Sequence, residues 1–260
     1  MIKSLFFDID GTLVSFNTHT IPDSTIAALE LAHKNGVKIF ISTGRPKVFV
    51  INLKQIEHLI SGYILNNGAV SFVGDETVSC NPIPPNEVDI IINDAQQFDY
   101  PYIIMGEKDF AVVKFEPVVD RIFDEELKIF NIRNGKTPEE VLKQRIFQIT
   151  PFIYSDHEKL LLPKIPGCMS NRWNPEFTDI TSKYADKGKG LTAMAEHLGL
   201  QISETMAFGD GGNDIPIIRC AGVGVAMGNA DDDVKQVADY VTNTVDEDGV
   251  YNALKHFNVI

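Results

Sequence analysis

Short apolar runs alternate with glycine-containing polar turns at both ends of this chain. Runs rich in Phe, Ile and Val predict buried strands, because a strand covered on both faces needs no alternating polar positions. The predicted strands cover residues 2–7, 37–41, 63–65 and 206–208 and part of 222–228. Helical apolar spacing predicts helices near residues 23–34, 48–59 and 187–198. This β-α-β order predicts a parallel sheet whose strand carboxyl ends face one crevice.

The middle of the chain has a different pattern. Residues 70–73 and 77–80 flank a Gly-Asp-Glu turn and predict a hairpin, and a proline-rich linker follows. Helices are then expected near residues 88–98 and 118–129 and from residue 138, with strands near 103–105, 110–114, 146–149, 167–170 and 177–180. We therefore predict an α/β fold, with a discontinuous parallel-sheet domain (1–83 and 184–260) and an inserted α+β domain (84–183).

Two carboxylates follow the first predicted strand directly. Asp8 and Asp10 are one residue apart, and Gly11 and Thr12 come next. Alternation along an extended backbone would place both carboxylates on one side, where their charges repel. Carboxylate oxygens at a strand end suit Mg²⁺, which leaves positions for water and a phosphate. The alternative is a turn in which an Asp caps a following helix.

The second and third predicted strands also end in polar turns. Thr43, Gly44 and Arg45 follow the second strand, at the sheet end that Asp8 and Asp10 share. A hydroxyl, open backbone amides and a guanidinium could hold a phosphoryl group there. An ordinary strand-to-helix loop is the alternative. Asn67, after the third strand, could reach the crevice or serve only its own turn.

The last third of the chain adds a lysine and two carboxylates. Lys187 stands at the start of a predicted helix, where the helix dipole disfavours a cation, so an anionic partner is expected. A solvated lysine is the alternative. Asp210 and Asp214 follow another strand and would join the first pair. Four carboxylates around one point require a metal to offset their repulsion.

Composition limits the classes of partner. The net charge of −13 argues against a nucleic-acid binder and against binding to anionic membranes. The three cysteines are odd in number and lie far apart, which is typical of a reduced intracellular protein. The start of the chain lacks the apolar core of a signal peptide, and no window has the length and apolarity of a membrane span. We therefore expect a cytoplasmic protein.

Four sequence blocks occur in the order found in one superfamily. They are Asp8-Ile9-Asp10-Gly11-Thr12, Ser42-Thr43-Gly44-Arg45, Lys187-Gly188 and Gly209-Asp210-Gly211-Gly212-Asn213-Asp214. In this order they resemble the haloacid dehalogenase superfamily of phosphotransferases. The stretches Val225-Ala226-Met227-Gly228-Asn229-Ala230 and Asp248-Gly249-Val250 are similar to its Cof-type sugar-phosphate phosphatase branch. The resemblance implies a Rossmann-like core and makes the inserted segment a class IIB cap.

The resemblance also implies roles for the acidic residues. Asp8 would be the nucleophile that forms an aspartyl-phosphate, and Asp10 the general acid and then the base. Mg²⁺ would be held by Asp8, the backbone carbonyl of Asp10, and Asp210, with Asp214 bound directly or through water. Thr43 and Lys187 would bind the phosphoryl oxygens, together with Gly44 and Arg45. Asn213 would orient Lys187 or the phosphate.

These roles predict a Mg²⁺-dependent phosphatase that acts on small phosphorylated metabolites, plausibly hexose phosphates. A phosphomutase of the same superfamily is the first alternative, because an aspartyl-phosphate can return its phosphoryl group to a sugar. A phospho-accepting receiver domain also places Asp, Thr and Lys at parallel-strand ends. Receivers, however, have about half this length and carry the accepting Asp on a middle strand. The expected partner is thus a small phosphorylated substrate, and neither nucleic acid nor a membrane.

Overall fold

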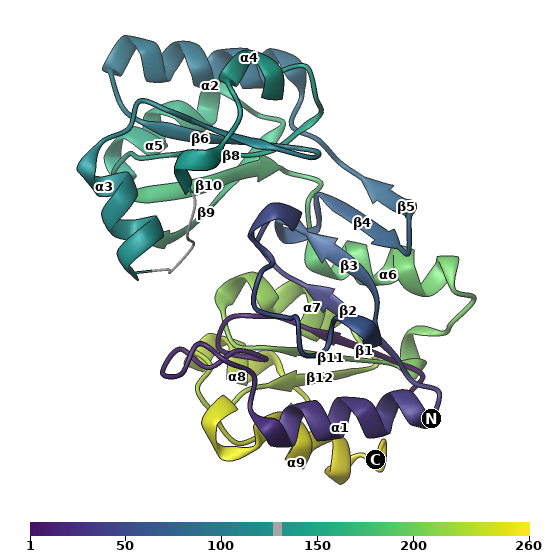
Figure 1. Ribbon diagram of the computed structural model, residues 1–260. Helices are drawn as coiled ribbons and strands as arrows, with labels where there is room; N and C mark the ends of the chain where they lie inside the picture. The colour runs from purple at the N-terminus through teal and green to yellow at the C-terminus, as the bar shows by residue number, and fades with distance from the viewer. Residues whose placement is uncertain (127–131) are drawn as a thin grey trace. The chain divides into compact units, whose positions relative to one another are not determined.

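The computed structural model describes residues 1–126 and 132–260 and divides the chain into two compact units (Figure 1). Unit 1 contains Met1–Arg45, Val50–Cys80 and Ala185–Ile260. Unit 2 contains Pro46–Phe49 and Asn81–Tyr184. Each unit has its own sheet, so the predicted α/β class with an additional α+β layer is confirmed. Across the described parts of the chain, none of the helices combines the length and apolarity that a membrane span needs.

Unit 1 is built on a mainly parallel sheet. Its described strands, in sheet order, are β13 (Tyr240–Val241), β12 (Val223–Ala226), β11 (Thr205–Gly209), β1 (Ser4–Phe7), β2 (Lys38–Ser42), β3 (Ile60–Leu65), β4 (Val70–Val73) and β5 (Glu76–Cys80). The pairs from β13 to β3 are parallel, and β4 and β5 add an antiparallel hairpin. Phe7 of β1 lies level with Phe208 and Ile41, so β1, β11 and β2 end at nearly the same height.

Helices cover both faces of this sheet because alternate strand residues point to opposite sides. Phe7 stacks on Phe208 in an apolar cluster that includes α1 (Asp23–Lys34) and α9 (Gly249–His256). Phe6 stacks on Phe40 in a second cluster that includes α6 (Lys187–His197) and α7 (Ile215–Cys220). A shorter helix, α8 (Asp232–Val237), contributes Val234 to this second cluster. The loops that follow these strands thus extend from a sheet that is fixed by two cores.

The prediction of a helix over residues 48–59 is wrong. The structure has short 3₁₀ turns at Lys47–Phe49 and Glu57–Leu59, with irregular backbone between them. The apolar residues do have helix-like spacing, but they belong to different cores. Phe49 packs in a cluster of unit 2, whereas Leu53, Ile56 and Leu59 join the α1 and α9 cluster of unit 1. One continuous helix face cannot serve both clusters.

Unit 2 is an antiparallel sheet with helices. Its described strands, in sheet order, are β7 (Phe110–Val113), β6 (Tyr102–Gly106), β8 (Ile146–Pro151), β10 (Phe177–Ser182) and β9 (Cys168–Asn174). Its described α-helices are α2 (Pro85–Phe98), α3 (Pro117–Asp120), α4 (Pro138–Val141) and α5 (Ser155–Leu161). A helix was predicted over residues 118–129. In the described part of this range the structure has α3, followed by a π-helical turn at Arg121–Glu126. Residues 127–129 lie outside the described residues, and α5 was not predicted.

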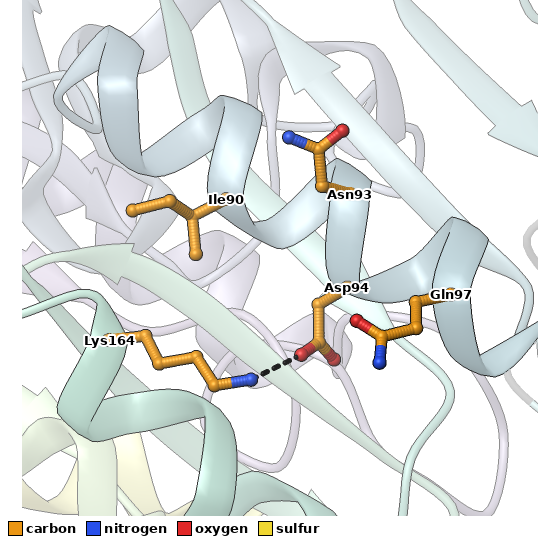
Figure 2. A pocket seen from close by; sticks show the side chains of 5 residues that line it. All are labelled: Ile90, Asn93, Asp94, Gln97 and Lys164. Carbon is orange, nitrogen blue, oxygen red and sulfur yellow. Dashed lines mark hydrogen bonds and ion pairs between the residues drawn. The ribbon is translucent and has the colours of Figure 1, made fainter.

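A buried carboxylate lies at the edge of a small pocket in unit 2 (Figure 2). The pocket, about 200 Å³ in volume, is lined by Ile90, Asn93, Asp94, Gln97 and Lys164. Asp94 accepts hydrogen bonds from Tyr100 at 3.0 Å and Lys164 at 2.9 Å, and its Oδ2 lies 2.5 Å from Nε2 of His157. Burial alone would raise the pKa of Asp94, but these hydrogen bonds outweigh it and lower the pKa. The satisfied carboxylate therefore stabilises unit 2.

Asp94→Ala is expected to lower the free energy of unfolding at neutral pH by about 2 kcal/mol, because it removes a buried, hydrogen-bonded charge. The folded pKa of Asp94 lies below its unfolded value of about 3.9, so the stabilisation is complete above that pH. The stabilisation is lost as the pH falls through the folded pKa. The difference in free energy of unfolding between wild type and Asp94→Ala should therefore become smaller there. Urea denaturation at several pH values measures this. Asp156→Ala, whose side chain is 94% exposed, is the control, and equal stability of both variants would contradict the assignment.

Candidate active site

The candidate residues of the sequence blocks all belong to unit 1, and all except Lys187 follow the carboxyl ends of its parallel strands. Asp8 comes directly after β1, Thr43 directly after β2, and Asp210 directly after β11. Because these strands are adjacent and parallel, their ends meet at one edge of the sheet. Lys187, the first residue of α6, reaches the same edge through its side chain. The topology thus assembles residues that are up to about two hundred positions apart in sequence.

Lys187 is the centre of the cluster. Its ammonium group has no solvent exposure and donates to Asp8 Oδ1 at 2.8 Å and to Asp214 Oδ1 at 2.5 Å. Asp186 precedes it as the N-cap of α6 and accepts from the backbone N–H of Lys189 at 2.9 Å. The anionic partners that offset the unfavourable helix position are therefore two carboxylates of the protein itself.

The Asp210 side chain is held by residues from two other loops. Thr12 Oγ1 donates to Asp210 Oδ1 at 2.7 Å, and Asn229 Nδ2 lies 3.5 Å from Asp210 Oδ2. Asn229 also donates to the carbonyl oxygen of Gly11 at 2.8 Å. Gly11 has φ +77°, and a Cβ there would lie 2.1 Å from Asp210 Oδ2. Glycine is required at this position both for the left-handed backbone and for the close approach of the carboxylate.

Three carboxylates form a group that could hold a metal. One oxygen each of Asp8, Asp210 and Asp214 lie within 4.8 Å of one another. Oδ2 of Asp214 accepts from the backbone N–H groups of Asp210 and Gly211, both at 3.1 Å. Among the described residues, none donates a hydrogen bond to Asp8 Oδ2. This oxygen is the part of the carboxylate that is available to a ligand.

The charges of the group are unbalanced within the protein. Burial raises the pKa of Asp8 well above its usual range; Lys187 opposes this shift, and the neighbouring carboxylates add to it. Burial also raises the pKa of Asp210 to about 7, although the hydrogen bond from Thr12 acts to lower it. For Lys187, burial acts to lower the pKa, but the charges of Asp214 and Asp8 outweigh it and raise the pKa. One ammonium thus faces three carboxylates. Such a donor set fits a hard divalent cation.

Asp10 has a different partner from the metal-binding group. Arg45 donates to both of its oxygens, from Nε at 2.8 Å and from Nη2 at 2.6 Å. The expected alternation does not apply, because β1 ends at Phe7 and the chain turns beyond it. Three of the four expected carboxylates, those of Asp8, Asp210 and Asp214, form the close group, while the carboxylate of Asp10 is paired with a guanidinium and its charge still acts on Asp8 and Asp210. That pairing was not predicted.

The residues with a predicted phosphate contact lie in adjoining loops. Thr43 is buried, and its Oγ1 accepts from the backbone N–H of Arg45 at 3.1 Å. Asn213 Nδ2 donates to Asn67 Oδ1 at 3.0 Å, and the Asn67 amide lies against Gly44. Thr12 and Asn229 lie within the sequence blocks that resemble the superfamily, but their contacts with Asp210 were not predicted. Their place in those blocks is the only feature of the sequence that points to them.

Known proteins resemble this chain over nearly its whole length. A family model described as haloacid dehalogenase-like hydrolase matches residues 5–254, which include all the candidate site residues. The chain belongs to the haloacid dehalogenase-like hydrolase family. A solved haloacid dehalogenase structure, described as a subclass IIB sugar phosphatase, is 46% identical, with a TM-score of 0.88 over 99% of this chain and 100% of that chain.

Two curated Bacillus subtilis (strain 168) relatives cover nearly the whole haloacid dehalogenase-like chain. YkrA, named as a candidate phosphatase, is 32% identical over 99% of this chain and 98% of its own. YcsE, a 5-amino-6-(5-phospho-D-ribitylamino)uracil phosphatase by name, is 30% identical over 98% of this chain and 96% of its own. The resemblance to the haloacid dehalogenase superfamily predicted from the four blocks is confirmed, and the protein is a hydrolase of that family.

Proposed function

We propose that this hydrolase is a Mg²⁺-dependent phosphatase of small phosphorylated metabolites, with sugar phosphates as its main substrate class. One observation carries the proposal. Asp8 lies buried in the acidic group with Oδ1 bonded to Lys187, while none of the described residues donates to Oδ2. A carboxylate fixed by one oxygen and open at the other is oriented for in-line attack.

Asp8 is the nucleophile of the proposed reaction. Its Oδ2 attacks phosphorus, the bond from phosphorus to the leaving oxygen breaks, and an aspartyl-phosphate forms. Asp10 gives a proton to the leaving alkoxide and later takes one from the attacking water, which releases inorganic phosphate and restores Asp8. The two hydrogen bonds from Arg45 orient the Asp10 carboxylate for these transfers.

Positive charge and hydrogen-bond donors hold the phosphoryl group. The ammonium of Lys187, the hydroxyl of Thr43 and the backbone at Gly44 are the proposed contacts, with Arg45 supplying further charge. Asn213 orients the phosphate or Lys187. Without such groups, the repulsion between a carboxylate and a phosphate dianion would prevent attack.

The acidic group fits Mg²⁺ by its chemistry. Asp8, Asp210 and Asp214 supply clustered carboxylate oxygens, and the backbone carbonyl of Asp10 would supply another oxygen. When bound, Mg²⁺ neutralises charge on the phosphoryl oxygens and on the carboxylates. The raised pKa values of Asp8 and Asp210 support this fit, because burial, with the neighbouring carboxylates, disfavours their charged forms more than Lys187 favours them, and a bound cation would offset that cost.

The substrate class is inferred from the relatives. A subclass IIB neighbour is described as a sugar phosphatase, and YcsE is named for a ribityl phosphate. Both leaving groups are polyhydroxylated alcohols. We assign unit 2 the role of the cap, which selects the leaving group and excludes water. A phosphomutase would need a phosphorylated sugar to recapture the phosphoryl group, and no observation favours that reaction here.

With Mg²⁺ present, the wild-type protein is expected to release phosphate from hexose and pentitol phosphates with higher kcat/KM than from nucleoside monophosphates. Phosphate release over a substrate panel measures this, and a run with excess chelator should lose nearly all turnover, because the acidic group then repels the substrate. Restored activity after Mg²⁺ is added back is the control for irreversible damage. Preference for nucleotides would overturn the substrate class, and full turnover in chelator would overturn the metal dependence.

A further inference from the structure

The turn after β3 has an unusual backbone. Asn66, Asn67 and Gly68 have φ values of 50°, 55° and 93°, three consecutive residues in the left-handed region. Asn adopts this region more readily than most residues, but it still costs energy there. Asn66 and Asn67 are also buried. Strain of this kind persists where surrounding contacts determine the conformation, and it concentrates at functional sites.

The turn is bonded to the loop after β2. The backbone N–H of Asn67 donates to the carbonyl oxygen of Thr43 at 3.1 Å, and that of Asn66 donates to Arg45 at 3.3 Å. A Cβ added at Gly44 would lie 3.0 Å from Asn67 Oδ1 and 3.2 Å from its Nδ2. The Asn67 amide therefore packs directly on the Gly44 backbone, and its distance from the Thr43 loop is fixed.

The same side chain contacts the loop after β11. Asn67 Oδ1 accepts from Asn213 Nδ2 at 3.0 Å, a contact that crosses 146 positions of sequence. Asn213 lies one residue before Asp214, whose carboxylate bonds Lys187. Within residues 1–126 and 132–260, this is the one hydrogen bond of the Asn67 side chain.

The turn also packs against the start of α6. A Cβ at Gly68 would lie 2.3 Å from the carbonyl oxygen of Asp186, so the turn meets the backbone just before Lys187. Residues 66–68 thus touch the three segments that carry Thr43, Lys187 and Asn213. Each of these residues has a proposed role in phosphate binding.

We propose that Asn67 is a positioning residue for the phosphate site, a role that rests on the proposed phosphatase function. Its amide sets the spacing between the Gly44 backbone and the Asn213 side chain, and it acts on the substrate through Asn213. The left-handed conformation is what directs the Asn67 side chain between these two loops. This role explains why a buried, strained turn is kept beside the acidic group.

Asn67→Gly tests the side chain alone, because glycine adopts the left-handed conformation without strain. We expect kcat/KM for an aryl phosphate to fall about tenfold, and the inhibition constant of inorganic phosphate to rise by a similar factor. The melting temperature should stay close to that of Asn66→Gly, the matched control in the same turn. Asn66 Nδ2 has no hydrogen-bond partner among the described residues, so this control should keep wild-type kinetics.

A double-mutant cycle tests whether Asn67 acts through Asn213. If it does, Asn67→Gly combined with Asn213→Ala should be no slower than Asn213→Ala alone. The positioning role would be overturned if the kcat/KM losses of the two single variants multiplied in the double variant, or if Asn67→Gly left phosphate inhibition unchanged. Phosphatase activity of the wild-type protein would still support the proposed function in either case. A wild-type protein that neither hydrolyses the aryl phosphate nor binds inorganic phosphate would overturn both proposals.

Discussion

Asp8→Asn is expected to lower kcat for an aryl phosphate by at least about 10⁴-fold, the scale seen when a catalytic nucleophile is removed. The amide has nearly the shape of the carboxylate, and its oxygen can still accept from Lys187 Nζ, which now donates at 2.8 Å. It cannot form the aspartyl-phosphate, however, because an amide oxygen is a poor nucleophile. Steady-state phosphate release at saturating Mg²⁺ measures the effect.

The stability of Asp8→Asn should rise or stay unchanged, although its activity falls. Burial and neighbouring carboxylates raise the pKa of Asp8, so the fold disfavours its charged form. A neutral isostere removes that cost, as is common where function requires an unfavourable charge. The melting temperature without Mg²⁺ should therefore equal or exceed that of wild type. Asp156→Asn, on the exposed surface of unit 2, is the control for both the kcat and the melting-temperature measurements. Turnover in Asp8→Asn near the level of this control would remove the nucleophile assignment.

Local sequence patterns predicted most of the sheet and the residues at its edge. The strand after residue 36 and the runs at 2–7 and 206–208 were found because buried parallel strands are continuously apolar. Parallel pairing then sends every strand end to one edge, so the positions of Asp8, Thr43 and Asp210 followed from order along the chain. The ligand roles of these residues remain predictions.

Contacts between distant loops were not predictable in the same way. In the sequence, Arg45 is a cation next to a glycine, and only the folded loops show that its guanidinium contacts Asp10. Thr12 and Asn229 reach Asp210 through turns whose direction no periodicity encodes. The incorrect helix over residues 48–59 has a related cause. Apolar spacing records that side chains are buried, and it does not record which core buries them.

Lys187→Met is expected to reduce kcat/KM by about 10³-fold and the free energy of unfolding by about 3 kcal/mol. Methionine fills much of the same space, but it leaves Asp8 and Asp214 buried without the ammonium that now lies within 2.8 Å of each. Phosphate release measures the first effect, and urea denaturation in chelator measures the second. Lys189→Met, at an exposed position on the same helix, is the matched control.

Mg²⁺ should restore more stability to Lys187→Met than it adds to wild type, because the cation and the ammonium neutralise the same carboxylates. The increase in melting temperature on adding Mg²⁺ is therefore expected to be larger in the variant, although turnover stays low because Mg²⁺ does not replace the lysine contact with the phosphoryl group. An equal increase in both proteins would mean that the metal and Lys187 act on separate charges. In that case the group of Asp8, Asp210 and Asp214 would not be the Mg²⁺ site.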